Sequence, residues 1–290
     1  MLDSTLTYLA GIDPKQWLLF GLFPAFLGVA AVEFFHFRGK DVYKLQDSLA
    51  SMVLGASYLI FEVALYALFV WSVYDWSYQY RLATIAITPL TLLALYLLVD
   101  LLFWTYHFTA HKVRFFWATH CVHHASEHMN FTTAMRQSAV YPLAAVWAFF
   151  LPLSFLGYER EWIFFALACN LAYQFFLHTQ WIDKLPAPIE FILNTPSHHR
   201  VHHGRNDRYI DKNFGGTLII FDRVFGTFQA EDPRETPDYG ITRQVHSYNP
   251  IVLTFHEWRD MLRDVSRPGP LAQRLKHVWA APEWTRDTEN

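Results

Sequence analysis

Charged residues are scarce in this chain. Only 17% of its 290 residues are Asp, Glu, Lys or Arg, whereas 53% are hydrophobic. Because soluble domains carry roughly 25% charged residues, this deficit favours an integral membrane protein. The net charge of −3 also gives no basic surface of the kind that binds nucleic acid.

Cysteines and cofactor-binding motifs are equally sparse. Cys121 and Cys169 are the only cysteines and form no C-x-x-C pair, which excludes a disulfide framework. No G-x-G-x-x-G segment follows an expected strand, and there is no flavin, haem or iron–sulfur motif, so a redox reaction would need an external electron donor. Residues 1–17 lack the basic region and cleavage site of a secretory signal peptide, and we expect no cleaved leader there.

Apolar stretches dominate the first two thirds of the chain. Five of them approach the roughly 20 residues that a helix needs to cross a bilayer. The last two are separated by a short turn and could form either a full or a re-entrant hairpin. We therefore expect an all-α membrane bundle of four to five spans, within a single domain over residues 1–290. The expected spans are residues 17–37, 48–74, 82–106, 139–157 and 162–178.

The basic residues set the expected orientation. They gather in three segments, which follow the first, third and fifth spans, and basic loops face the cytoplasm. The same three segments contain most of the histidines, so we expect a histidine-rich helical cap on the cytoplasmic face of a bacterial inner membrane or of the endoplasmic reticulum. Residues 250–290 form an amphipathic tail, whose helices we expect at the surface, on the membrane.

Histidine is the residue that stands out. The chain has 15 histidines, and eleven of them fall between His107 and His203. They form one H-x-x-x-H box and two H-x-x-H-H boxes, with a lone histidine at the end of the fifth span. The candidate metal ligands are His107, His111, His120, His123, His124, His178, His199, His202 and His203.

The spacing within the boxes indicates metal binding. Residues three or four apart share a helix face, so each box can point two or three imidazoles in one direction. Eight or nine imidazoles are too many for one ion, since a structural zinc takes four ligands, and they predict two metals. Imidazole suits iron, zinc, copper and nickel alike, so the ligands alone do not name the metal.

Several neighbouring residues have two possible roles. His178 could be a ligand or an interfacial polar residue, and His128 could contact the ligands or be solvated. We favour the later box histidines over His198 as ligands. Asp100 lies seven residues before His107, two turns along the same face, where it could accept the second N–H of a metal-bound histidine or pair with a polar group elsewhere. Residues 213–222 could shape a loop over the metals or be a simple glycine-rich turn.

The three boxes, in this order, resemble the fatty acid hydroxylase superfamily, which includes sterol desaturases and sterol methyl oxidases. Residues 116–138 and 193–231 are similar to its alkylglycerol monooxygenase-like branch, and the resemblance covers about residues 100–231. It implies two iron ions held by the box histidines and His178, O₂ as co-substrate, a membrane lipid as substrate and an external electron donor or reductant.

The resemblance favours hydroxylation of a lipid C–H bond in a fatty acyl chain, an ether lipid or a sterol. A desaturase or a C-4 methyl oxidase remains an alternative, because these reactions begin with the same hydrogen abstraction. A divalent metal-binding or transport protein is a further alternative. Transporter ligands usually lie near the bilayer midplane, whereas the boxes are expected at the cytoplasmic ends of the spans. The oligomeric state is left open.

Overall fold

The computed structural model describes residues 14–286, and within them the regular structure is helical. Two isolated β-bridges, Leu193 with Leu218 and Gly204 with Tyr239, are the extended pairings found in this part of the chain. The all-α expectation is therefore confirmed for the described residues. The expectation that no leader is cleaved concerns residues 1–17, which lie mostly outside them.

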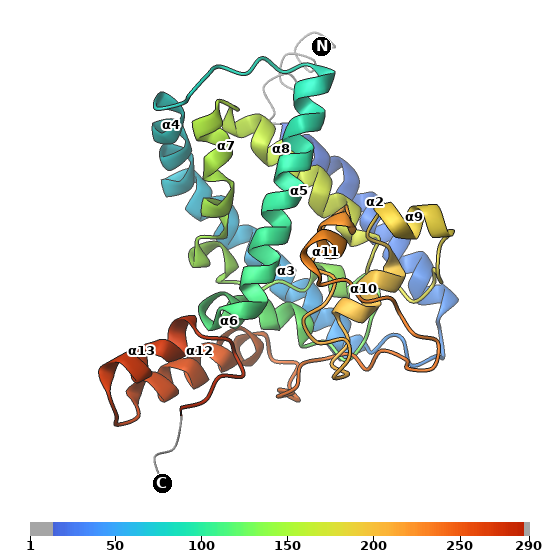
Figure 1. Ribbon diagram of the computed structural model, residues 1–290. Coiled ribbons are helices and arrows are strands. Elements are labelled where there is room, and N and C mark those ends of the chain that lie inside the picture. Colours follow the sequence, from blue (N-terminus) through green and yellow to red (C-terminus); the bar gives the residue numbers. More distant parts are fainter. Residues whose placement is uncertain (1–13, 287–290) are drawn as a thin grey trace.

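Long apolar helices build the bundle shown in Figure 1. The first is α2 (Pro14–His36). Then α3 (Leu45–Leu65) runs through the π-helix η1 (Tyr66–Val70) into α4 (Trp71–Gln79) without a break. The others are α5 (Pro89–Lys112) and α8 (Arg160–Phe175), which pack against each other.

The start of α5 has a clear local cause. The Thr88 hydroxyl accepts a hydrogen bond from the backbone N–H of Thr91, and the Thr91 hydroxyl accepts one from the N–H of Thr88, a reciprocal capping box. Pro89 occupies the first helical position, where its missing N–H costs nothing. The helix therefore begins seven residues later than the predicted span and continues to Lys112, so that it includes the whole first histidine box.

Two continuous helices are long and apolar enough to cross a membrane. The run Leu45–Gln79 has a mean hydropathy of 2.0 and Pro89–Lys112 one of 1.6 in their most apolar windows, and only 17% and 33% of those windows are buried inside the protein. A soluble core helix would be buried on most sides. Leu68 and Leu90 are instead 83% and 75% exposed, which indicates that these faces meet lipid and that this is a membrane protein.

The predicted fourth span, residues 139–157, is not a single helix. Ala145, with a left-handed φ of 57°, separates η3 (Tyr141–Ala144) from η4 (Val146–Phe150), and η4 continues directly into α7 (Leu151–Leu156). The continuous apolar helix Val146–Leu156 extends only about 17 Å at 1.5 Å per residue. The number of spans therefore remains a prediction.

Shorter helices surround the end of α5 that carries the first histidine box (Figure 1). Among them α6 packs against both α5 and α12, and α12 pairs with α13. The expected amphipathic tail contains α12 and α13. The shorter helices are α6 (Arg114–His124), η2 (Thr133–Met135), α9 (Ala187–Ile192), α10 (Pro196–His202), α11 (Ile220–Phe225), α12 (Pro250–Ser266) and α13 (Leu271–Trp279).

Candidate metal centre

Four parts of the fold bring the nine candidate ligands together. The last two turns of α5 carry the first box, and α6 carries the second. The turn after α8 supplies His178, and α10 with the residue that follows it supplies the third box. All nine imidazoles are buried, so the chain has placed nine polar rings in a site that excludes water.

The nine rings separate into two groups, each with its ring nitrogens within 4.8 Å of one another. We call them cluster A and cluster B. Each could hold one metal ion, which agrees with the expectation of two metals. Cluster A is His107, His111, His120, His124 and His202, and cluster B is His123, His178, His199 and His203.

Cluster B contains a contact that hydrogen bonding does not explain. The Nδ1 atoms of His123 and His178 face the carbonyl oxygens of Arg136 and Gln174 at 3.0 and 2.9 Å. A carbonyl oxygen only accepts, so both Nδ1 atoms carry the proton. The Nε2 atoms of the two neutral rings are then unprotonated, yet they lie 3.2 Å apart. Two lone pairs at this distance repel each other.

A cation between the two lone pairs removes this repulsion. Two imidazole nitrogens bound at right angles to one ion, each about 2.1 Å from it, lie about 3 Å apart. The same spacing recurs between His199 and His178 Nε2 (2.9 Å) and between His107 and His120 Nε2 (2.9 Å). In cluster A the Nε2 atoms of His111 and His202 are buried without any hydrogen-bond partner. The residues present therefore fit a metal ion in each cluster.

Burial keeps these imidazoles neutral. Desolvation is the largest cause that holds the pKa of His124, His202 and His203 well below the usual value, and repulsion between neighbouring imidazoles lowers it further. Neutral imidazole is the form that binds metal. The clusters are thus ready to bind a cation without first releasing protons.

This electrostatic arrangement predicts an acid-sensitive apoprotein. Histidines of the unfolded chain have a pKa of about 6.5 and become protonated as the pH falls below it, whereas the buried imidazoles of the folded clusters stay neutral. The free energy of unfolding therefore falls as the pH falls. At about pH 5.5 each such histidine lowers the free energy of unfolding by about 1.4 kcal/mol. We expect the melting temperature of the metal-free protein in detergent to fall steeply between about pH 7.5 and about pH 5.5. An unchanged melting temperature over this interval would contradict the neutral clusters.

One loop contacts three of the five candidate ligands of cluster A. The His111 Nδ1 atom lies 3.2 Å from the Asp211 carboxylate. The His202 Nδ1 atom lies 2.9 Å from the Lys212 carbonyl oxygen, and the His107 Nδ1 atom lies 2.9 Å from the Phe214 carbonyl oxygen. We call residues 211–214 the support loop. Such partners fix the tautomer and orientation of metal-binding imidazoles. Residues 213–222, which the sequence suggested as a loop over the metals or a glycine-rich turn, do not include Asp211 and Lys212.

Asp211 is the charged member of the support loop. Burial alone would raise its pKa, but the hydrogen bond with His111 and the contact with Lys112 lower it to about 2. The carboxylate therefore stays ionised beside cluster A. Asp211 and Asn213 both have a left-handed φ of 58°, and aspartate and asparagine tolerate this conformation better than other residues. This Asp-x-Asn pattern is the signal that could have identified the loop.

Two buried carboxylates hold the segment that follows the support loop. Asp222 accepts hydrogen bonds from the backbone N–H groups of Phe214 and Gly215, both at 2.8 Å. Asp100 accepts from the N–H groups of Thr217 and Leu218 at 2.7 and 2.9 Å. Among the described residues no histidine donates to Asp100, so its partners are polar groups elsewhere in the fold, the alternative role considered above.

Gly216 allows Asp100 to approach this segment. A Cβ atom at Gly216 would lie 2.6 Å from the Asp100 Oδ1 atom and 2.7 Å from the Asn170 Oδ1 atom. We expect Gly216→Ala to detach these contacts, lower stability by about 1–3 kcal/mol and weaken metal retention, as measured by thermal unfolding and metal analysis. Gly28→Ala is the matched control, because nothing lies within 4 Å of its added Cβ. Equal melting temperatures for the two variants would contradict this role.

Cluster B has its own supports. The Arg136 carbonyl accepts from His123, while the buried Arg136 guanidinium pairs with Asp47 of α3 at 3.0 Å. Next to His178, the Thr179 hydroxyl donates to Glu33 of α2, which also accepts from the N–H of Phe131 at 2.8 Å. Helices α2 and α3, which lie far from the histidine boxes in the sequence, therefore support both ends of cluster B.

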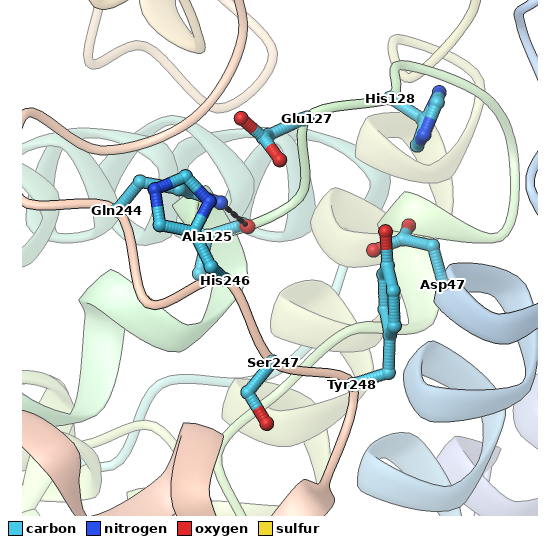
Figure 2. A pocket seen from close by; sticks show the side chains of 8 residues that line it. All are labelled: Asp47, Ala125, Glu127, His128, Gln244, His246, Ser247 and Tyr248. Atoms are coloured by element: carbon cyan, nitrogen blue, oxygen red, sulfur yellow. Dashed lines mark hydrogen bonds between the residues drawn. The ribbon is translucent and has the colours of Figure 1, made fainter.

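The remaining histidines near the boxes lie outside the clusters. The His198 Nε2 atom lies 3.0 Å from Glu190. His128 and His246 line a small surface pocket beside the loop after α6, where the Gln244 amide donates to the Ala125 carbonyl at 2.8 Å (Figure 2). None of these three histidines joins either group of candidate ligands.

Comparison with known proteins places this site in a family. The fatty acid hydroxylase family model matches residues 92–227. Human alkylglycerol monooxygenase is 39% identical over 249 residues, which are 85% of this chain and 55% of the human protein. The Caenorhabditis elegans alkylglycerol monooxygenase is 35% identical over 262 residues, 84% of this chain and 50% of the relative.

A more distant relative is the ornithine lipid hydroxylase of Rhizobium tropici, 27% identical over 139 residues, 48% of this chain and 42% of that protein. The chain spans about half the length of the curated relatives it matches. No solved structure matches it. All nine clustered histidines lie within the matched segment. Residues 92–227 therefore form a fatty acid hydroxylase family domain.

Proposed function

We propose that this protein is a membrane-bound di-iron monooxygenase that hydroxylates a C–H bond of a lipid. The observation that carries the proposal is the pair of buried imidazole clusters, in which lone pairs of His123 and His178 face each other at 3.2 Å. The names of the relatives, alkylglycerol monooxygenase and ornithine lipid hydroxylase, support lipid hydroxylation as the reaction. Iron is the metal implied by the resemblance that the three histidine boxes carry.

Cluster A would hold one iron ion and cluster B the other. When bound, the two ions supply the activation of O₂, in which two electrons and two protons accompany insertion of one oxygen atom into the C–H bond and release of the other as water. The electrons come from an external donor. The chain contributes nine neutral imidazoles, whose burial keeps bulk water from the reacting carbon. The support loop keeps cluster A in one geometry.

The position of the clusters suggests how a lipid reaches them. His107 and His111 lie in the last turns of α5, one of the two apolar helices with exposed faces. We propose that the lipid enters sideways from the bilayer. We also propose that the bundle crosses the membrane four to five times, with both clusters near the cytoplasmic surface.

The relatives suggest which lipid to test first. Two of the compared proteins are named for alkylglycerols and one for an ornithine lipid. An alkylglycerol ether is therefore the first candidate substrate. The same names describe hydroxylation, which favours an alcohol product over a new double bond.

Metal analysis and product analysis test the proposal. Protein purified anaerobically in detergent should contain about two iron ions per chain, with the Mössbauer signature of a coupled pair. With isotopically labelled O₂, a reductant and an alkylglycerol in bilayers, label should appear in the oxidised lipid. A single tightly bound zinc, with no iron after anaerobic reconstitution, would contradict the di-iron centre. Two irons with an unlabelled, desaturated product would contradict the hydroxylase.

A further inference from the structure

An apolar stripe on α12 is largely exposed. Ile251, Phe255 and Leu262 are 70%, 48% and 60% exposed. Their spacings of four and seven residues place them on one face of the helix. The other side of α12 buries Leu253 and Met261, where the helix packs against α6. The exposed stripe is thus a second apolar face, distinct from the one that holds α12 in the fold.

The partner helix of this hairpin repeats the pattern. In α13, Leu271, Leu275 and Trp279 are 63%, 41% and 55% exposed, and their spacing of four residues keeps them on one side. Helices α12 and α13 pack against each other. Six large apolar side chains are thus exposed on two neighbouring helices, and exposed apolar faces are typical of protein or membrane contacts.

Trp258 shows which way the α12 stripe points. It lies four residues before Leu262 and seven after Ile251, so it belongs to the same face. Its ring packs edge-on against Phe115, with centroids 5.2 Å apart, and Phe115 packs against the core of the bundle. The stripe therefore faces the side on which the apolar helices rise. Figure 1 shows the hairpin lying across the direction of α5, beneath that bundle.

A buried arginine fixes the hairpin to the metal centre. Arg114, at the start of α6, donates to the carboxylates of Glu257 at 2.6 Å and Asp264 at 2.8 Å, both on α12. Its backbone N–H donates to the Ala280 carbonyl, just after α13, at 3.0 Å. Because α6 also carries the second histidine box, these contacts join the hairpin to the helix that holds three of the candidate ligands.

We propose that the α12–α13 hairpin lies in the surface of the membrane that the apolar helices enter, with its exposed stripes among the lipids. Interfacial helices bury such a face about 5–10 Å into the boundary between headgroups and acyl chains. Residues 250–279 contain five Arg or Lys against three Asp or Glu, which favours anionic headgroups. The hairpin then sets the depth of α6, and with it the height of both clusters above the lipid. This inference rests on membrane insertion and not on the identity of the metals.

Two pairs of neighbouring residues test the hairpin in the full-length protein. Leu262→Cys is matched with Arg263→Cys, whose native side chain is 58% exposed, and Leu275→Cys is matched with Lys276→Cys. Each variant, in a Cys169→Ser background because Cys121 is buried, receives a bimane fluorophore. The labelled proteins are placed in nanodiscs of phosphatidylcholine and phosphatidylglycerol.

Quenching by nitroxide on the acyl chains reports lipid contact, and quenching by iodide reports water. We expect the labels at 262 and 275 to be quenched by lipid nitroxide at least about twofold more than their neighbours, and to be protected from iodide. Iodide quenching equal to that of the neighbours would place the stripes in water and overturn the proposal. Protection from both quenchers would show that a second protein covers them, which would also overturn it. Neither readout depends on metal content or turnover.

Discussion

Replacing His202 with alanine is expected to remove the metal of cluster A, whereas replacing its neighbour His203 is expected to remove the metal of cluster B. The two residues are adjacent in the sequence, but their rings belong to different clusters. Metal content should fall from about two ions to about one per chain in each variant. The rate of hydroxylation should fall by at least about a hundredfold, because loss of a ligand has a larger effect than loss of a residue that only hydrogen-bonds to a ligand.

The two variants check each other. Both remove one buried imidazole, so a general loss of folding would affect them alike, while spectroscopy of the remaining ion should differ because the clusters have five and four histidines. His246→Asn is the control, since His246 is exposed and has a left-handed φ of 49° that asparagine tolerates. Two ions and unchanged turnover in either alanine variant would contradict the division into clusters.

The division of the boxes follows from helix geometry. Residues four apart are rotated by only about 40°, whereas residues three apart differ by about 60° in the opposite direction. Accordingly His120 and His124 share cluster A, and His199 and His203 share cluster B. The middle histidine of each H-x-x-H-H box, His123 or His202, points to the other cluster. Spacing therefore predicted that these histidines gather, and the same spacing also contains their division between the two clusters.

Other parts of the structure depend on contacts that spacing does not encode. The support loop meets His107 and His111 from about a hundred residues away along the chain, so no local pattern links them. The break at Ala145 is equally hidden, because alanine carries no sign of a left-handed φ. Hydrophobicity predicted an unbroken span there, since it measures burial in lipid and not backbone continuity.

Replacing Asp211 with asparagine is the sharpest test of the support loop. Asparagine keeps the shape of the side chain and tolerates the left-handed φ of 58°, so the loop should keep its course. The change removes the negative charge that faces the His111 imidazole and the Lys112 ammonium group. Carboxylates that accept from a metal-bound histidine make it a stronger ligand, and their loss typically costs 10–100-fold in metal affinity.

We therefore expect the dissociation constant of cluster A, measured by chelator competition, to rise by about 10- to 100-fold, with cluster B unchanged. Asp207→Asn makes the same chemical change four residues earlier on an exposed side chain and should leave both constants as they are. Asp211→Ala should raise the dissociation constant of cluster A more than Asp211→Asn does, because it also removes the hydrogen-bond acceptor and strains the backbone. If Asp211→Asn bound metal as tightly as the native protein, orientation by the loop carbonyls alone would account for cluster A, and the ionised carboxylate would serve only to hold Lys112.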